Sequence, residues 1–177
     1  MKPYAVVFAG VPGSSKTIIA NYLSGIFGLP VFNNDQLRHE VKEDLMLDDI
    51  NIPEALAEFE KRLKARYLAF LGTGRPIIFD SGVDRRWAET KQLLQDAGYS
   101  WYLINMELTK PFLAKLFKAT GRAGLATDYL DKYTAQHEAF IKKYAADVNL
   151  QISDDAFKNR LALAEDGLRK FIGSLEK

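Results

Sequence analysis

Short apolar runs recur along the chain and are separated by longer segments with a helical pattern. Tyr4–Ala9 is an unbroken β-prone run without polar alternation, which is typical of a strand buried on both faces. Pro76–Phe79 and Trp101–Met106 have the same character, and we expect weaker strands at Val31–Asn33 and Asn149–Ile152. The pattern therefore predicts a sheet of about five strands.

The segments between these runs predict helices. After Pro53, apolar residues repeat at steps of three and four until a glycine-rich stop at 72–74, which indicates a long amphipathic helix. Further helices are expected at 16–27, 36–49, 85–97, 111–120 and 128–146, with a closing helix that includes Phe157. Strands that alternate with helices predict an α/β fold of three layers, a parallel sheet with helices on both faces.

Composition narrows the class of protein. The 177 residues carry a net charge of +1 and no cysteine, so we expect one domain over residues 1–177 without disulfides. This charge gives no global attraction to nucleic acid or membranes. We find no signal peptide and no apolar stretch long enough to span a bilayer, so a cytoplasmic protein is expected.

The strongest chemical signal is a glycine-rich segment between the first strand and the first helix. It consists of Gly10, Val11, Pro12, Gly13, Ser14, Ser15, Lys16 and Thr17. Glycines let the backbone turn its N–H groups toward one phosphate, and the helix N-terminus adds a positive dipole end. Lys16 can reach the β- and γ-phosphates, and the Thr17 hydroxyl can bind Mg²⁺. This order of strand, loop and helix predicts a P-loop for ATP and Mg²⁺.

One residue departs from the usual P-loop pattern. Ser15 stands where G-x-x-x-x-G-K-[ST] has its second glycine. A serine needs a backbone conformation that a side chain tolerates, and its hydroxyl is expected near the phosphates. The alternative to a P-loop is an ordinary Gly-Ser turn that happens to precede a lysine.

Carboxylates and arginines at the ends of strands are candidates for the reaction itself. Asp35 follows the second strand and Arg38 lies one helical turn later. Asp35 can accept a proton from an acceptor hydroxyl, and Arg38 can hold an anionic acceptor. The alternative for Asp35 is a helix N-cap, and both roles can coexist.

A second carboxylate follows the apolar strand at 76–79. Asp80 is a candidate ligand of Mg²⁺, directly or through water, and a candidate contact to substrate. Its alternative is a turn or N-cap residue before the helix that carries Arg85 and Arg86. We expect Arg86 on the substrate side.

A lid is expected over residues of about 111–135. Lys118 and Arg122 flank the polar loop 121–127 and could close over the phosphates and exclude water. The alternative is that these cations only favour the dipole at a helix C-terminus. His39 and His137 have no partner at metal-ligand spacing and are expected to be surface or packing residues.

Three motifs together resemble the small P-loop kinases that include the kinase domain of polynucleotide 5′-kinases. They are G-x-P-G-S-x-K-T, the N-x-D-x-x-R segment at 33–38, and the stretch from Ile77 to Arg86 that begins I-I-F-D-S. The likeness covers about residues 4–145. It implies that Lys16 and Thr17 bind the triphosphate and Mg²⁺, that Asp35 is the general base, and that Arg122 is a catalytic lid arginine. Lys118 stands where relatives often have a second arginine.

The function that these observations favour is ATP-dependent transfer of the γ-phosphate to a hydroxyl of a small molecule, a nucleoside or a 5′-hydroxyl nucleic acid. One alternative is a nucleotide kinase with a phosphate acceptor, in which a base at Asp35 is not needed. Another is a nucleotide-binding regulatory protein in which Ser15 marks a loop that binds but turns over poorly. Neither membrane nor nucleic acid is indicated as a partner by charge.

Overall fold

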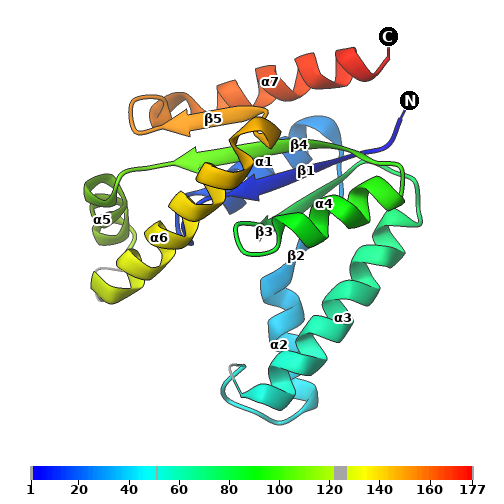
Figure 1. Ribbon diagram of the computed structural model, residues 1–177, viewed down its shortest axis with the longest axis vertical. Coiled ribbons are helices and arrows are strands. Elements are labelled where there is room, and N and C mark those ends of the chain that lie inside the picture. Colours follow the sequence, from blue (N-terminus) through cyan, green and yellow to red (C-terminus); the bar gives the residue numbers. More distant parts are fainter. Residues whose placement is uncertain (1, 51, 122–126, 177) are drawn as a thin grey trace.

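The chain folds around one parallel sheet in the order β2-β3-β1-β4-β5 (Figure 1). The computed structural model describes residues 2–50, 52–121 and 127–176. The strands are β1 (Tyr4–Ala9), β2 (Val31–Asn33), β3 (Ile77–Gly82), β4 (Ser100–Glu107) and β5 (Leu150–Ser153). The α/β prediction is confirmed, and each strand lies within a few residues of its expected place.

Helices connect the strands. They are α1 (Lys16–Phe27), α2 (Asn34–Asp44), α3 (Pro53–Leu71), α4 (Trp87–Asp96), α5 (Lys110–Ala119), α6 (Thr127–Tyr144) and α7 (Arg160–Leu175), with 3-10 turns η1 (Ala145–Asp147) and η2 (Phe157–Asn159). Two expectations need correction. Helix α2 ends at Asp44 rather than near residue 49, because the chain turns through a left-handed residue at Met46 (φ +53°). Phe157 lies in η2, ahead of the closing helix.

The alternation along β1 divides the core into two. Tyr4, Val6 and Phe8 point into a cluster that α1, α5 and α7 cover, because successive side chains of a strand point to opposite faces. Ala5 and Val7 point into a second cluster on the other face, to which α2, α3, α4 and α6 contribute. Helices therefore cover both faces, as the sequence predicts, and the sheet is buried.

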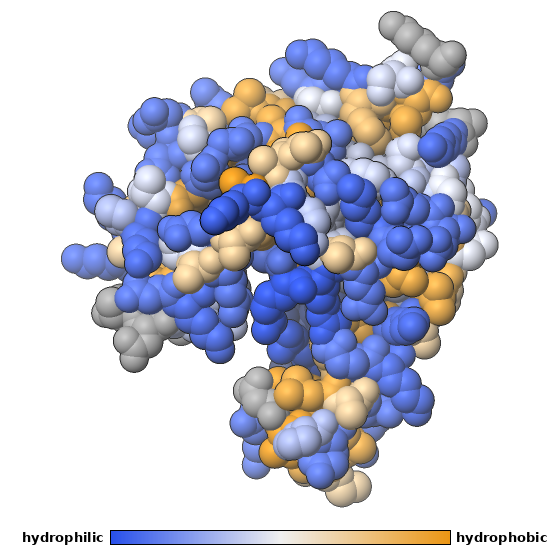
Figure 2. All heavy atoms as spheres, viewed as in Figure 1, coloured by the Kyte–Doolittle hydropathy of each residue, from blue (hydrophilic) through white to orange (hydrophobic). Residues whose placement is uncertain are grey.

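Helices α2 and α3 form an arm that extends away from the sheet at the lower end of the view (Figure 1). Ion pairs join the two helices, Arg62 with Asp44 and Arg66 with Glu40. Figure 2 shows a hollow between this arm and the α5–α6 side of the molecule, with hydrophilic side chains gathered around it. Nowhere in the described ranges is a helix both long and apolar enough to cross a membrane.

Candidate phosphate-binding and phosphotransfer site

The loop between β1 and α1 has the backbone of an anion cradle. Gly10 and Gly13 have φ values of +131° and +88°, which a side chain rarely tolerates. A Cβ atom at Gly10 would lie 2.7 Å from the Cβ atom of Met106 on β4, so only glycine fits there. The loop then enters α1 at Lys16, where the free N–H groups of a first helical turn favour an anion.

Ser15 also adopts the left-handed conformation, with φ +81°, as the glycine it replaces would. Its side chain makes no capping hydrogen bond to α1. Its hydroxyl instead accepts a hydrogen bond of 2.9 Å from Nε of Arg160, at the start of α7. The serine therefore keeps the glycine-like backbone and uses its hydroxyl for a contact 145 residues away.

The Lys16 ammonium group lies across the loop. Its Nζ donates to the carbonyl oxygens of Gly10 (2.7 Å) and Val11 (2.9 Å). Burial lowers the pKa of Lys16 to about 8, while the charges of Asp84 and Asp80 oppose that shift. This ammonium group also donates to the Ser14 hydroxyl (3.4 Å). A cation held by neutral oxygens of the loop, with two carboxylates nearby, is suited to bind a polyanion.

Thr17 and Asp80 meet beside this loop. The Thr17 hydroxyl donates to Asp80 Oδ1 at 3.1 Å. Asp80 lies within β3, only 8% exposed, and burial raises its carboxyl pKa, against the hydrogen bond from Thr17 and the charge of Lys16. A hydroxyl and a carboxylate oxygen side by side next to a phosphate cradle fit Mg²⁺, which prefers oxygen ligands and phosphate partners.

Other protein ligands for a metal do not gather there. Among the described residues, no group of three or more His, Asp or Glu side chains could hold a metal ion. The donor set therefore fits a cation that phosphate and water complete. Asp80 is a strand residue, so the alternative of a turn or N-cap role is wrong.

Asp84 is a third acidic group at the loop, which the sequence analysis did not single out. Both of its carboxylate oxygens lie 3.1 Å from the Gly10 amide, which donates to them. Its Oδ1 also lies 2.5 Å from Nδ1 of His137 on α6. Burial would raise the pKa of Asp84, but His137, Lys16 and the Gly10 amide hold it below its usual value.

His137 is buried, at 6% exposure, so the prediction of a packing residue holds only in part. The ring also pairs with a carboxylate that contacts the P-loop. Asp84 and His137 therefore connect α6 to the first residue of the cradle.

Asp35 lies in the first turn of α2, next to the same cluster. The N-cap of this helix is Asn33, whose Oδ1 accepts from the Asp35 amide at 2.7 Å. The alternative N-cap role for Asp35 is therefore wrong. Asn33 Nδ2 also donates to Asp80 Oδ2 at 3.4 Å, and the Asp35 charge raises the pKa of Asp80. The exposed Asp35 carboxylate therefore lies close enough for its charge to act on Asp80.

Arg38 and Arg86 come together on the arm side. The Arg38 guanidinium lies over the Phe59 ring at 4.9 Å from its centroid, and Arg86 forms an ion pair with Glu60 on the same helix, α3. Burial lowers the pKa of Arg86, Glu89 opposes the shift, and the Arg38 charge adds to it. The Arg38 charge on α2 therefore acts on Arg86, which lies at the N-terminus of α4.

The two expected lid cations have different outcomes. Lys118 lies in the last turn of α5, with an exposed side chain. No contact described for it reaches the P-loop. Arg122 lies outside the described residues, so its expected lid and catalytic roles stay predictions.

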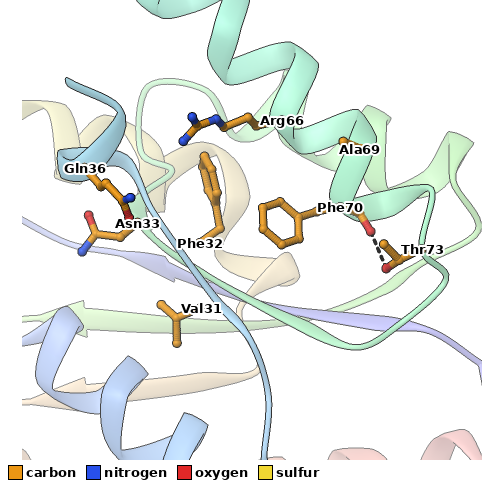
Figure 3. A pocket seen from close by; sticks show the side chains of 8 residues that line it. All are labelled: Val31, Phe32, Asn33, Gln36, Arg66, Ala69, Phe70 and Thr73. Atoms are coloured by element: carbon orange, nitrogen blue, oxygen red, sulfur yellow. Dashed lines mark hydrogen bonds between the residues drawn. The ribbon is translucent and has the colours of Figure 1, made fainter. Parts of the chain in front are cut away.

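A pocket of about 470 Å³ opens at the outer edge of the sheet, between β2 and the C-terminal half of α3 (Figure 3). Phe32 and Phe70 lie side by side in it, with Arg66 above them and Asn33 and Gln36 at one end (Figure 3). It shares only Asn33 with the cluster around Asp80, so it is a neighbour of the phosphate site.

Two residues at the site, Asp84 and Arg160, were not identified from the sequence, and the pairing of His137 with Asp84 was not expected. Asp84 lies two residues past the end of β3, so its place at a strand end was a usable signal. Arg160 likewise follows β5, after a short turn. His137 carries no such signal, because its place depends on how α6 packs across the sheet.

Comparison with solved structures identifies the fold. No family model matches the sequence, and no curated protein matches it either. A gluconokinase from Sinorhizobium meliloti 1021 superposes with a TM-score of 0.71 at 14% identity, over 99% of this chain and 97% of that one.

Two further kinases are similar in structure. Shikimate kinase from Acinetobacter baumannii, in complex with shikimate, has a TM-score of 0.62 at 14% identity, over 99% and 96% of the two chains. The APS kinase of Mycobacterium tuberculosis, in complex with AMPPNP and APS, has a TM-score of 0.57 at 15% identity, over 95% and 98%. The chain therefore has, over nearly its whole length, the fold of small P-loop kinases.

Proposed function

We propose that this protein is an ATP-dependent kinase that transfers the γ-phosphate to a hydroxyl of a small acceptor. The observation that carries the proposal is the convergence of Lys16, Thr17 and Asp80 on one glycine-rich cradle. A site that only binds phosphate needs the cradle and the lysine. A carboxylate bonded to the P-loop threonine adds what Mg²⁺-dependent phosphoryl transfer requires.

Each residue has a distinct role in this proposal. Lys16 would exchange the carbonyl oxygens of the loop for phosphate oxygens, and Thr17 and Asp80 would hold Mg²⁺. When bound, the ion would neutralise charge on the β- and γ-phosphates. Asp35 would accept the proton of the attacking hydroxyl, since its carboxylate is exposed and electrostatically close to Asp80.

The acceptor that fits best carries an anionic group as well as a hydroxyl. Arg38 and Arg86 lie near each other, and Glu60 is the only carboxylate described as an ion-pair partner of either. An anion bound between two arginines loses contacts with water, and charge-assisted hydrogen bonds to the guanidinium groups replace them. The neighbours named for gluconate, shikimate and APS support an anionic acceptor of modest size.

The deciding experiment is an ADP-release screen with ATP and Mg²⁺. Its acceptors are sugar acids and other hydroxy acids, neutral sugars, aminoglycosides, nucleosides, nucleoside monophosphates and 5′-hydroxyl oligonucleotides. We expect release with a hydroxy acid and none with the Lys16→Ala variant. Release only with monophosphates would favour a nucleotide kinase, and release with the oligonucleotide a polynucleotide kinase. Nucleotide binding without production of ADP with any acceptor would favour a regulatory protein.

A further inference from the structure

The hydrogen bond between Ser15 and Arg160 joins the P-loop to the last helix, and no role above uses it. The Arg160 guanidinium is held on three sides. Its Nε donates to the Ser15 hydroxyl (2.9 Å), its Nη1 donates to the Phe157 carbonyl oxygen (3.0 Å), and one face lies 4.2 Å from the Phe157 ring centroid. Phe157 is itself fixed edge-on against Phe112.

This geometry leaves part of the guanidinium for a ligand. Nη2 is used by none of the contacts described for Arg160, and the side chain is only partly buried. Burial nevertheless lowers the pKa of Arg160, and no carboxylate of the described residues forms an ion pair with it. A fixed cation without a counter-ion, bonded to the residue before Lys16, is suited to an anion bound by the loop.

The order of the sheet indicates which anion this is. The acceptor candidates follow β2 and β3, on one side of β1, whereas Arg160 follows β5, on the other side. In-line transfer places the acceptor and the leaving ADP on opposite sides of the transferred phosphoryl group. Arg160 therefore lies on the side of the leaving nucleotide, away from the hydroxyl that attacks.

From these observations we infer that Arg160 binds the α-phosphate of the donor nucleotide and that Ser15 is its positioning residue. The inference rests on the proposed function in one respect, namely which side of the P-loop the nucleotide occupies. It explains why a serine is accommodated at φ +81°, where its side chain is strained and glycine would not be. The serine supplies a hydroxyl that glycine lacks.

The first test measures dissociation constants for Mg²⁺–ADP and for tripolyphosphate by titration calorimetry. Arg160→Ala should weaken both ligands by about 10- to 100-fold, the range expected for a lost charge-assisted hydrogen bond. Arg160→Lys, which keeps the charge but not the three-sided fixation, should fall between. Arg169→Ala is the matched control, because Arg169 lies on the same helix and pairs with Glu165; it should leave both constants within about twofold.

The second test separates positioning from a merely structural role. Ser15→Gly should weaken Mg²⁺–ADP several-fold in the wild-type background and have no further effect in Arg160→Ala, since a positioning residue acts only through its partner. Its thermal midpoint should not fall, because glycine is relaxed at this φ value.

Three results would overturn the inference. The first is unchanged affinity for both ligands in Arg160→Ala. The second is weaker binding of ADP with unchanged binding of tripolyphosphate, which would place Arg160 at the nucleoside. The third is a wild-type protein that binds neither ligand. None of these measurements uses an acceptor. A failed acceptor screen would therefore remove the kinase proposal while the assignment of Arg160 stood or fell separately.

Discussion

At the scale of single residues, the site depends on how a few charges compensate each other. Lys16 faces two carbonyl oxygens of the loop and the fields of Asp80 and Asp84. Burial and, to a smaller extent, the Asp35 charge raise the pKa of Asp80, while the Thr17 hydrogen bond and the Lys16 charge oppose that shift. Small changes in protonation at this site should therefore be visible in nucleotide binding and in rate.

The Lys16 pKa of about 8 makes nucleotide binding dependent on pH. Phosphate oxygens favour the ammonium form, so binding should take up a proton above about pH 8, and affinity should decline as the pH rises further. Calorimetry of Mg²⁺–ADP at pH 8.5, in buffers with different ionisation enthalpies, measures this uptake.

The control for this prediction is Lys16→Arg, which stays charged throughout this range and should take up no proton. Equal heats in all buffers for the wild-type protein would contradict the prediction.

Asp35 should matter for rate and little for stability. Because Asn33 caps the helix, Asp35→Asn removes a carboxylate but no capping bond, so the loss should be limited to a helix-dipole effect of about 0.3–1 kcal/mol. Acceptor phosphorylation should fall by about 10²–10⁴-fold, as for a lost general base. Steady-state kinetics and thermal unfolding measure the two effects.

A matched control is Glu43→Gln, an exposed carboxylate on the same helix. It should leave the rate unchanged. If Asp35→Asn keeps transfer within a few-fold of wild type, the carboxylate is not the base and a phosphate-acceptor reaction becomes the better explanation.

At the scale of elements, close packing of α7 on the sheet constrains the helix at one glycine. A Cβ atom at Gly167 would lie 1.9 Å from the hydroxyl oxygen of Tyr102 on β4. That hydroxyl is buried without a hydrogen-bond partner among the described residues, and burial raises its pKa to about 12. The Tyr102 hydroxyl occupies the space that a side chain at position 167 would need, so only glycine fits there.

Gly167→Ala should accordingly destabilise the protein by about 1–3 kcal/mol, as overpacking does, measured by urea unfolding. Gly173→Ala in the same helix meets nothing within 4 Å and should stabilise by about 0.5–1 kcal/mol through helix propensity. Adding Tyr102→Phe to Gly167→Ala should recover most of the loss. Equal effects of the two alanines would show that contact with Tyr102 is not the cause.

The elements themselves were largely predictable from the sequence, and so was half of the site. Unbroken apolar runs predict the strands, and residues at their ends predict Asp80 and the P-loop. The N-cap of α2 is Asn33, whereas the sequence offered Asp35 as an alternative cap; both residue types cap well, so the sequence alone does not choose between them. The links of Ser15 to Arg160 and of Asp84 to His137 span 145 and 53 residues. They depend on tertiary packing, which periodicity does not contain.

At the scale of the whole molecule, the sheet order separates the proposed acceptor side from the proposed donor side. Asp35, Arg38 and Arg86 follow β2 and β3, and Arg160 follows β5. The P-loop after β1 lies between them. Variants on the two sides should therefore affect different kinetic constants.

Arg38→Ala and Arg86→Ala should each raise the KM for an anionic acceptor by about tenfold or more, the cost of a lost charge-assisted hydrogen bond. The dissociation constant of Mg²⁺–ADP should stay within about twofold of wild type. Arg85→Ala, which removes an exposed neighbouring charge, is the control and should change neither. Weaker ADP binding in Arg38→Ala would mean that the two sides are not separate.

The α2–α3 arm has a consequence for how such a protein can diversify. The arm is one uninterrupted stretch of chain between β2 and β3, which are neighbours in the sheet, and it carries Asp35, Arg38 and Glu60. A single recombination or grafting event with both junctions at these strands would exchange these three residues as a cassette. The P-loop, Asp84 and the last helix would be inherited intact, so the proposed acceptor side could change while the proposed nucleotide side stayed the same.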